Sequence, residues 1–164
     1  MAKKRPSKNM PDGIRMLVRN KRVSHDYTIH DTIEAGISLL GSEVKSLRDA
    51  RGSVVDGFVE FRRGEAWLLG VQINEYPWAN QYNHEPFRER KLLLHAHEIA
   101  KLATKVQQRG YSLVPTAFYL KNGRIKVELA LASGKRQYDK RQAAREATDK
   151  RETDRAIRNR GRGE

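Results

Sequence analysis

Short stretches in which apolar and polar residues alternate are spread along the chain, and this period of two is typical of half-buried strands. In residues 27–39, apolar side chains occupy every second position except position 31. Residues 55–73 contain two apolar runs around Arg63-Gly64, which predict a hairpin with its turn at that pair.

The strongest hairpin signal is Asn122-Gly123, which joins the apolar runs of residues 113–121 and 124–132. Asn-Gly suits a type I′ turn because both central residues of that turn need a positive φ. The second run alternates strictly, so it predicts a strand with one buried face.

Two helices are predicted between these strands. Residues 43–49 favour a short helix capped by Ser42, and residues 97–109 have apolar side chains at helical spacing before Gly110. The segment YPWANQYNHEPFRERK, residues 76–91, has no period and predicts a long irregular loop. Loops of that length in a compact domain are usually functional or disordered.

These elements predict a mainly β fold, with about six or more strands in a small antiparallel barrel or sandwich and helices at its periphery. We expect the domain to span residues 14–133, after a flexible basic arm at residues 1–13. A five- or six-stranded barrel with an interposed helix is a common nucleic-acid scaffold, although a scaffold alone does not establish a function.

The tail, residues 134–164, differs from the rest of the chain. Residues 139–164 hold a single large apolar side chain, Ile157, and their opposite charges at i,i+4 spacing stabilise a helix only weakly. A helix without an apolar face has nothing to dock, so we expect the tail to be disordered when free and helical on a partner.

The positive charge is concentrated at the two ends. Residues 1–22 have eight Lys or Arg against one Asp, residues 133–164 have eleven against six acids, and the span between them is nearly balanced. Basic extensions on a neutral globule favour a polyanion as partner. The absence of cysteine fits a reducing compartment. No stretch of the sequence reaches 18 apolar residues, so a membrane-spanning helix is not expected. Nucleic acid in the cytoplasm is therefore the first partner that we expect.

A metal site is the first chemical alternative. His84, His95 and His97 suggest a metal-dependent nuclease, but H-x-H is a short and common pattern and no HExxH spacing accompanies it. We therefore expect structural or surface roles for these histidines, with no catalytic residue, metal or cofactor.

Two basic clusters stand beside planar or apolar side chains. Asn20-Lys21-Arg22 precedes His25 and Tyr27, and Arg88 to Lys91 closes the long loop just before three leucines. Planar side chains next to cations are typical of surfaces that stack unpaired bases, although either run is also compatible with a solvated surface. Because alternate residues of a half-buried strand face opposite ways, at least one of Leu92, Leu93 and Leu94 is predicted to be exposed.

Four blocks, NKRVSHDYTI, EAGISLLGSEVKSLRDA, ANQYNHEPFRERKLLLH and GKRQYDKR, follow one another between residues 18 and 141. In this order they resemble the signature blocks of the bacterial small protein B family, the SsrA-binding (transfer-messenger RNA-binding) proteins of trans-translation. The resemblance implies an antiparallel oval barrel related to the OB fold, with two or three peripheral helices and a disordered basic C-terminal tail.

The resemblance also implies a function. Proteins of this family bind the tRNA-like domain of transfer-messenger RNA (SsrA) and deliver it to stalled 70S ribosomes, with elongation factor Tu and GTP joined indirectly through the RNA. Their tail enters the decoding centre beside 16S rRNA and folds along the empty mRNA channel, which leads to ribosome rescue and tagging of the nascent peptide. The family implies a monomeric cytoplasmic adaptor and no enzyme.

Carried over block by block, the candidates to face the tRNA-like domain are Asn20, Lys21, Arg22, His25, Tyr27, Glu34, Lys45, Arg48, Arg90, Lys91 and Leu93. The candidates for the decoding centre and mRNA channel are Gly134, Lys135, Arg136, Tyr138, Asp139, Lys140, Arg141 and Ile157. Glu34 is the unexpected member, because a carboxylate is repelled by phosphate but accepts hydrogen bonds from base amino groups and ribose hydroxyls. A generic RNA chaperone on the same barrel is the second binding hypothesis.

Overall fold

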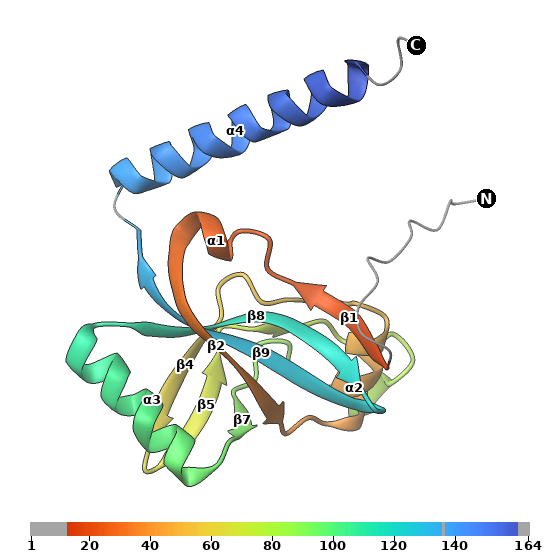
Figure 1. Cartoon of the computed structure of the whole chain (residues 1–164). Helices are drawn as coiled ribbons and strands as arrows, with labels where there is room; N and C mark the ends of the chain where they lie inside the picture. The colour runs from red at the N-terminus through yellow and green to blue at the C-terminus, as the bar shows by residue number, and fades with distance from the viewer. Residues whose placement is uncertain (1–12, 136, 161–164) are drawn as a thin grey trace.

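The computed structural model describes residues 13–135 and 137–160 (Figure 1). The elements in chain order are β1 (Ile14–Arg19), α1 (Val23–Asp26), β2 (Tyr27–Ile37), α2 (Gly41–Arg48), β3 (Gly52–Ser53), β4 (Phe58–Arg62), β5 (Glu65–Leu69), β6 (Gln72–Ile73), a 3₁₀ turn (Asn80–Tyr82), β7 (Arg90–Leu93), α3 (Ala96–Arg109), β8 (Ser112–Lys121), β9 (Arg124–Gly134) and α4 (Gln137–Arg160).

Seven strands form one antiparallel sheet in the order β1-β8-β9-β2-β7-β5-β4, and β3 pairs with β6 in a small second sheet. The large sheet curls, so that β4 at one edge lies against β8. Within residues 13–135 no ladder joins β1 to β4, so hydrogen bonds do not close the barrel. The mainly β, antiparallel, barrel-like fold with peripheral helices is confirmed.

The core lies inside the curl of the sheet. Its most buried side chains include Leu68, Leu92, Phe118 and Leu129, each from a different strand. Leu47 from α2 joins the same cluster, which holds α2 against the sheet.

Both predicted hairpins are confirmed, and their turns have the backbone that the sequence requires. Arg63 and Gly64 have φ of 49° and 75°, and Asn122 and Gly123 have φ of 51° and 76°. Helix α3 is also confirmed, and Gly110 ends it with a φ of 61°, which is a left-handed conformation that glycine adopts without strain.

Two local predictions need correction. Ser42 does not cap α2: the helix begins at Gly41, two residues before the predicted start, and the carboxylate of Glu43 accepts the backbone N–H of Leu40 at 2.8 Å. Strand β1 was not identified in the sequence, where its apolar positions are mixed with two arginines. Strand β2 is continuous, but a bulge between Ile29 and Asp31 interrupts its alternation and leaves Ile29 exposed.

The first residue of the predicted tail belongs to the sheet. Gly134 is the last residue of β9 and is paired with Tyr27 of β2. Residues 137–160 then form α4, a single helix that extends away from the sheet in Figure 1. This is the helical form that we expect for the tail on its partner, and its state when free stays a prediction.

Candidate nucleic-acid interface

The outer face of the sheet carries side chains from five strands in one continuous row. Met16, Tyr119, Lys126, Gly36 and Leu93 are successive cross-strand partners on β1, β8, β9, β2 and β7. Directly opposite residues in antiparallel strands point to the same face, so this row shares one side of the sheet.

A second row runs beside the first. Arg19, Ala117, Glu128 and Glu34 are partners across β1, β8, β9 and β2, and Glu34 lies two residues from Gly36. The period of two puts both rows on the same face. Glu34, Leu93 and the Arg19–Asn20 region therefore lie on one surface, although they are far apart in the sequence.

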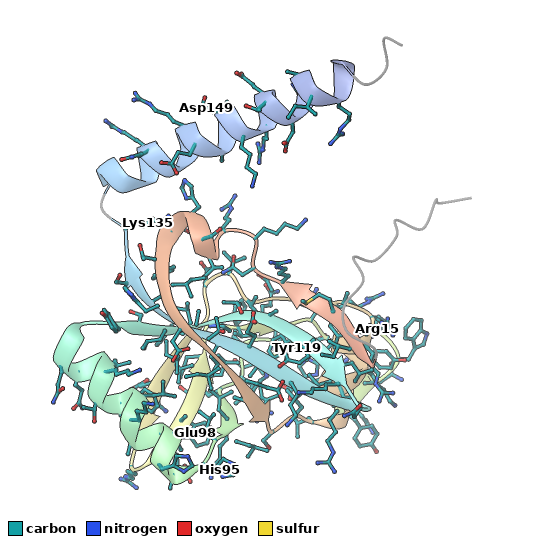
Figure 2. The ribbon with its side chains drawn as sticks, in the orientation of Figure 1. Arg15, His95, Glu98, Tyr119, Lys135 and Asp149 are labelled. Atoms are coloured by element: carbon teal, nitrogen blue, oxygen red, sulfur yellow. The ribbon has the colours of Figure 1, made fainter. Side chains whose placement is uncertain are left out.

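Glu34 is held in place by two neighbours on β8. The Tyr119 hydroxyl donates to Oε2 of Glu34 at 2.5 Å, and Lys121 Nζ lies 3.0 Å from the same oxygen. Both hydrogen bonds, with the Tyr119 bond the larger cause, lower the pKa of Glu34. Burial and the bond to Glu34 raise the pKa of Tyr119, which lies over the sheet in Figure 2. An ionised, oriented acceptor thus stands on the outer face.

Gly36 gives Leu93 its place on this face. A Cβ at Gly36 would lie 3.0 Å from the Leu93 Cβ, so the missing side chain leaves room for the leucine. Leu93 is 56% exposed whereas Leu92 is 1% exposed, which confirms that one leucine of this run faces solvent. Beside Leu93 is a groove of about 310 Å³ lined by Val44, Arg124 and Lys126 among others.

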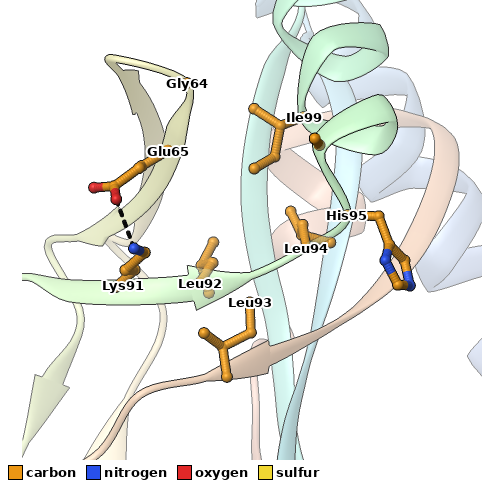
Figure 3. A pocket seen from close by; sticks show the side chains of 9 residues that line it. Gly64, Glu65, Lys91, Leu92, Leu93, Leu94, His95 and Ile99 are labelled. Atoms are coloured by element: carbon orange, nitrogen blue, oxygen red, sulfur yellow. Dashed lines mark hydrogen bonds and ion pairs between the residues drawn. The ribbon is translucent and has the colours of Figure 1, made fainter.

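On its other side Leu93 borders a wider hollow between β7 and the start of α3, of about 470 Å³ (Figure 3). Leu94 and Ile99 form its apolar floor. Lys91 lies at its rim, with Nζ 2.6 Å from Oε1 of Glu65, and both side chains of this pair are partly exposed. Lys91 therefore presents a cation at the edge of an apolar surface.

The Asn20-Lys21-Arg22 segment divides into one buried residue and two exposed ones. The Asn20 backbone N–H donates to the Thr116 carbonyl at 2.7 Å, and its side-chain oxygen accepts the Arg22 N–H at 2.9 Å. Asn20 thus orients the segment, while Lys21 and Arg22 are exposed. Lys21 also lines a hollow with Arg19 and Glu128 on the outer face.

Helix α1 places the next two candidates. His25 Nδ1 lies 3.0 Å from the Asp26 carboxylate, and half of the His25 side chain is exposed. Tyr27 packs partly against Val23 and its cluster, so only part of its ring is accessible.

The prediction for Arg90 needs correction. Arg90 was predicted to face RNA, but it is 0% exposed, because its Nε donates to Oε1 of Glu43 at 2.8 Å and its other nitrogens donate to the carbonyls of Val71 and Pro86 at 2.9 and 3.0 Å. The guanidinium therefore joins α2 to two segments of the interior. Arg88, two residues earlier, is the one that reaches the surface.

Glu43 receives these cations at the centre of the molecule. Burial raises the pKa of Glu43, but the bond from Arg88, the Leu40 N–H and the charge of Arg90 outweigh it, so the pKa is lowered. Burial also lowers the pKa of Arg90, against the effect of Glu43. The Glu43 carboxylate accepts a hydrogen bond from Arg88 Nη2 at 2.8 Å through Oε2. All buried side-chain polar atoms in the described residues have a partner.

Lys45 and Arg48 are both exposed on α2. Lys45 Nζ stands 5.6 Å from the centre of the Tyr76 ring, a cation–π contact. The Arg48 carbonyl accepts a hydrogen bond from Arg15 Nη2 at 3.2 Å, so a third cation is held next to them.

The nuclease constellation does not assemble. His84 is buried, with Nδ1 2.8 Å from the Ser42 hydroxyl and Nε2 2.8 Å from the Ile73 carbonyl, whereas His95 and His97 stack on each other at the start of α3. Residues 13–135 and 137–160 contain no group of three metal-ligating side chains. Among the helices of this part of the chain, none is long and apolar enough to cross a membrane.

Comparison with known proteins gives the family. The family model described as SmpB protein matches residues 17–159. The chain belongs to the SmpB protein family. Two SsrA-binding proteins are similar over most of their length: that of Thermobifida fusca is 51% identical over 98% of this chain and 99% of the relative, and that of Streptomyces avermitilis is 53% identical over 92% and 86%.

A solved structure supports the same family. It is described as "tmRNA-SmpB: a journey to the center of the bacterial ribosome", and its matching chain is 44% identical with a TM-score of 0.63. The match covers 77% of this chain and 93% of the solved one.

The tail candidates of this SmpB family member are only partly described. Arg136 lies outside the described residues, and for Tyr138, Asp139 and Lys140 the structure gives the helical backbone alone. Arg141 and Ile157 are exposed on α4, and Ile157 is 65% exposed. Lys135 is joined to α1 instead: its N–H donates to the Asp26 carbonyl at 3.0 Å and its Nζ to the Ser24 carbonyl at 2.7 Å. Figure 2 shows it at the junction of β9 and α4.

Sequence reasoning missed three residues of the interface, Arg19, Tyr119 and Lys121. The signal that identifies Tyr119 and Lys121 is the hairpin register, because the Asn122-Gly123 turn pairs Lys121 with Arg124 and Tyr119 with Lys126. Arg19 is placed by the pairing of β1 with β8, which no turn signal in the sequence indicates. Only the pairing of β9 with β2, which joins residues about a hundred positions apart, then brings Tyr119 to Glu34.

Proposed function

We propose that this chain is the transfer-messenger RNA-binding adaptor of trans-translation. The outer face of β7-β2-β9-β8-β1 binds the tRNA-like domain, and the tail enters the decoding centre of a stalled ribosome. The observation that carries the proposal is the convergence of Glu34, Leu93 and the Arg19–Arg22 segment on one face of a chain from the SmpB family.

The residues on this face have complementary tasks. Exposed Lys21 and Arg22 and partly exposed Lys91 neutralise phosphates, and the Leu93 side chain covers a base or ribose. The Glu34 carboxylate accepts hydrogen bonds from base amino or ribose hydroxyl groups, and Tyr119 and Lys121 keep it oriented. His25 and Tyr27 offer partly exposed rings for stacking. Asn20 and Arg90 are buried, so they do not contact RNA themselves but hold neighbouring segments in position.

The remaining parts of the proposal concern partners. The protein acts as a monomer in the cytoplasm, elongation factor Tu with GTP joins through the RNA, and the adaptor itself catalyses no step. Residues Gly134 to Arg141 and Ile157 belong to the segment that approaches 16S rRNA and the mRNA channel. The side chains of α4 that the structure describes support this assignment, because all of them are exposed and so available to a ribosomal partner.

The test is a truncation placed by the structure. Ending the chain after Lys135 keeps the pairing of Gly134 with Tyr27 and both hydrogen bonds of Lys135, and it removes α4 entirely. The expected result is an affinity for the tRNA-like RNA within about threefold of the full chain, roughly 0.6 kcal/mol, together with loss of tagging on stalled ribosomes. A truncated chain that folds but no longer binds this RNA, or that still supports tagging, would contradict the division between sheet and tail.

A further inference from the structure

The loop between β6 and β7 presents three aromatic side chains to solvent, and Trp78 and Tyr82 are more exposed than the third, Phe87. Trp78 is 70% exposed and Tyr82 is 80% exposed, although both residue types normally bury much of their surface. Between them lie the exposed polar residues Asn80 and Gln81, so the two rings do not form a contiguous apolar patch. The function proposed above uses neither ring.

The part of the loop that carries these rings is closed on itself. Asn83 accepts the Tyr76 N–H through Oδ1 and donates to the Tyr76 carbonyl through Nδ2, both at 2.8 Å. Inside this closure, Ala79 N–H donates to the Tyr76 carbonyl and Tyr82 N–H to the Ala79 carbonyl, each at 3.0 Å. The rings therefore stand on a backbone with a defined shape, which reduces the ordering cost of binding a ligand.

The loop is also fastened to α2 at both of its ends. The Ser46 hydroxyl donates to the Asn74 carbonyl at 2.6 Å, before the aromatic segment. After it, buried His84 bridges the Ser42 hydroxyl and the Ile73 carbonyl, at 2.8 Å each. These contacts fix the aromatic segment beside the exposed face of α2, which carries Lys45 and Arg48.

A cation lies beside Tyr76, the aromatic neighbour of Trp78. Tyr76 meets Trp78 edge to face at 5.2 Å, and Lys45 Nζ is 5.6 Å from the Tyr76 ring centre. Arg48 and Arg15 follow on the same side of α2, joined by the bond between Arg15 and the Arg48 carbonyl. The neighbouring carboxylates in the sequence are those of Asp49, Glu75 and Glu85, against the cations of Arg15, Lys45, Arg48 and Arg51, so the positive groups are in slight excess and favour an anionic partner.

We propose that Trp78 and Tyr82, with Lys45 beside them, form a stacking site for unpaired nucleotides of RNA. Exposed planar rings take the faces of bases and the flanking cations take phosphates, which is the arrangement by which proteins bind single-stranded segments. The proposal rests on the RNA-binding function given above and extends it, because it adds a second contact at the α2 end of the sheet.

Trp78 provides its own reporter. The chain has two tryptophans, so Trp67→Phe leaves Trp78 as the only one. Adding tRNA-like-domain RNA to this variant is expected to quench its fluorescence and to protect it from iodide, because a stacked base covers the indole. The matched variant Trp78→Phe keeps Trp67 on β5 and measures the response of the rest of the molecule. The difference between the two variants belongs to Trp78.

Affinity supplies the second measurement. The double variant Trp78→Ala, Tyr82→Ala is expected to lower the affinity for the RNA about tenfold, with no change in the slope of log affinity against log salt, because no phosphate contact is removed. Phe58→Ala is the matched control: Phe58 is an exposed aromatic on β4, at the sheet edge opposite β1, and its loss is expected to leave the affinity unchanged.

The outcomes separate this site from the function on which it rests. If the full chain does not bind the RNA, both the adaptor function and the stacking site are wrong. If it binds but Trp78 is not quenched and the double variant binds equally well, the stacking site is wrong and the adaptor function stands. A Trp78 response to ribosomal protein but not to RNA likewise overturns the proposal and assigns the loop to a protein contact.

Discussion

Leu92 and Leu93 are adjacent in the chain, yet they belong to opposite sides of the sheet. Leu92 is packed in the core among side chains of several strands, whereas Leu93 lies over Gly36 with most of its surface in solvent. The same chemical change at the two positions therefore has different physical consequences.

Replacing Leu92 with Ala is expected to lower the free energy of unfolding by about 2–5 kcal/mol, because it leaves a cavity in the core. Replacing Leu93 with Ala is expected to change that free energy little and to weaken RNA binding about tenfold, since burial of a leucine on binding contributes roughly 1.5–3 kcal/mol. Urea unfolding and RNA titration of both variants make the comparison. A Leu93→Ala variant that is as unstable as Leu92→Ala would place this leucine in the core instead.

The stability of the protein depends on the buried ion pairs of Glu43, which no pattern in the sequence indicates. The Glu43 carboxylate is fully buried and is surrounded by Arg88, Arg90 and the Leu40 N–H. Removing one member of a buried ion pair leaves the other charge without compensation, which costs about 3–5 kcal/mol. Glu43→Gln is therefore expected to destabilise the protein by about that amount.

Glu43 also makes the free energy of unfolding depend on pH in the acid range. The pKa of Glu43 is lowered in the folded protein from its ordinary value of 4.5. Its contribution is therefore complete above that value and is lost as the pH falls through the lower folded pKa. Urea unfolding at several pH values is expected to show a flatter acid limb for Glu43→Gln than for the parent. Glu65→Gln, which removes a partly exposed partner of Lys91, is the control and is expected to have little effect.

At the scale of the elements, α3 and α4 are helices of opposite kinds. Helix α3 has apolar side chains packed against the core and a Glu98 carboxylate that accepts the His95 N–H at its start. Helix α4 is exposed along its described side chains and depends mainly on its own backbone hydrogen bonds. Most helical stability comes from packing of an apolar face, so the two differ in stability.

We therefore expect the backbone amides of α4 to exchange with deuterium close to the rate of an unfolded chain, while those of α3 are protected with most of the global stability. Protection of α4 is expected to appear when the protein is bound to a stalled ribosome. Hydrogen-exchange mass spectrometry of the free and bound protein makes this measurement. Slow exchange of α4 in the free protein would contradict the prediction of a tail that folds on its partner.

The elements that the sequence predicts best are those with local causes. The two hairpins follow from the conformations that Arg63-Gly64 and Asn122-Gly123 adopt, and α3 follows from its spacing and from Gly110. Arg90 was misplaced because a run of cations looks the same whether its members face solvent or Glu43. Which cation turns inward is decided by a carboxylate 47 residues away, and no local pattern records that contact.

At the scale of the whole molecule, we assign RNA binding to the outer face of the sheet and contact with the ribosome to the tail. The two surfaces meet at the end of β9. The outer face of the sheet collects residues from β1, α1, β2, β7 and β8, and α4 leaves from the end of β9 (Figure 1). Lys135 connects the two, because it bonds to α1 through both its backbone and its side chain. The last residue described before α4 is thus fastened to the segment that carries His25.

A shaped face predicts selectivity beyond charge. An adaptor for one folded RNA is expected to prefer the tRNA-like domain over an equal mass of poly-U by at least about tenfold, roughly 1.4 kcal/mol, whereas a generic RNA chaperone is not. Competition at a fixed salt concentration measures the ratio, because the affinity for any polyanion depends on salt. Equal competition would favour the chaperone.

The buried Glu43–Arg90 pair also bears on how this chain is able to change over evolutionary time. A substitution at either position alone leaves an uncompensated charge in the interior, so the intermediate with one change is poorly stable. Positions 43 and 90 should therefore remain fixed or change together among related proteins, in the manner of covarying sites. Arg88, whose side chain is partly exposed, is under a weaker constraint of the same kind and should vary more among related proteins.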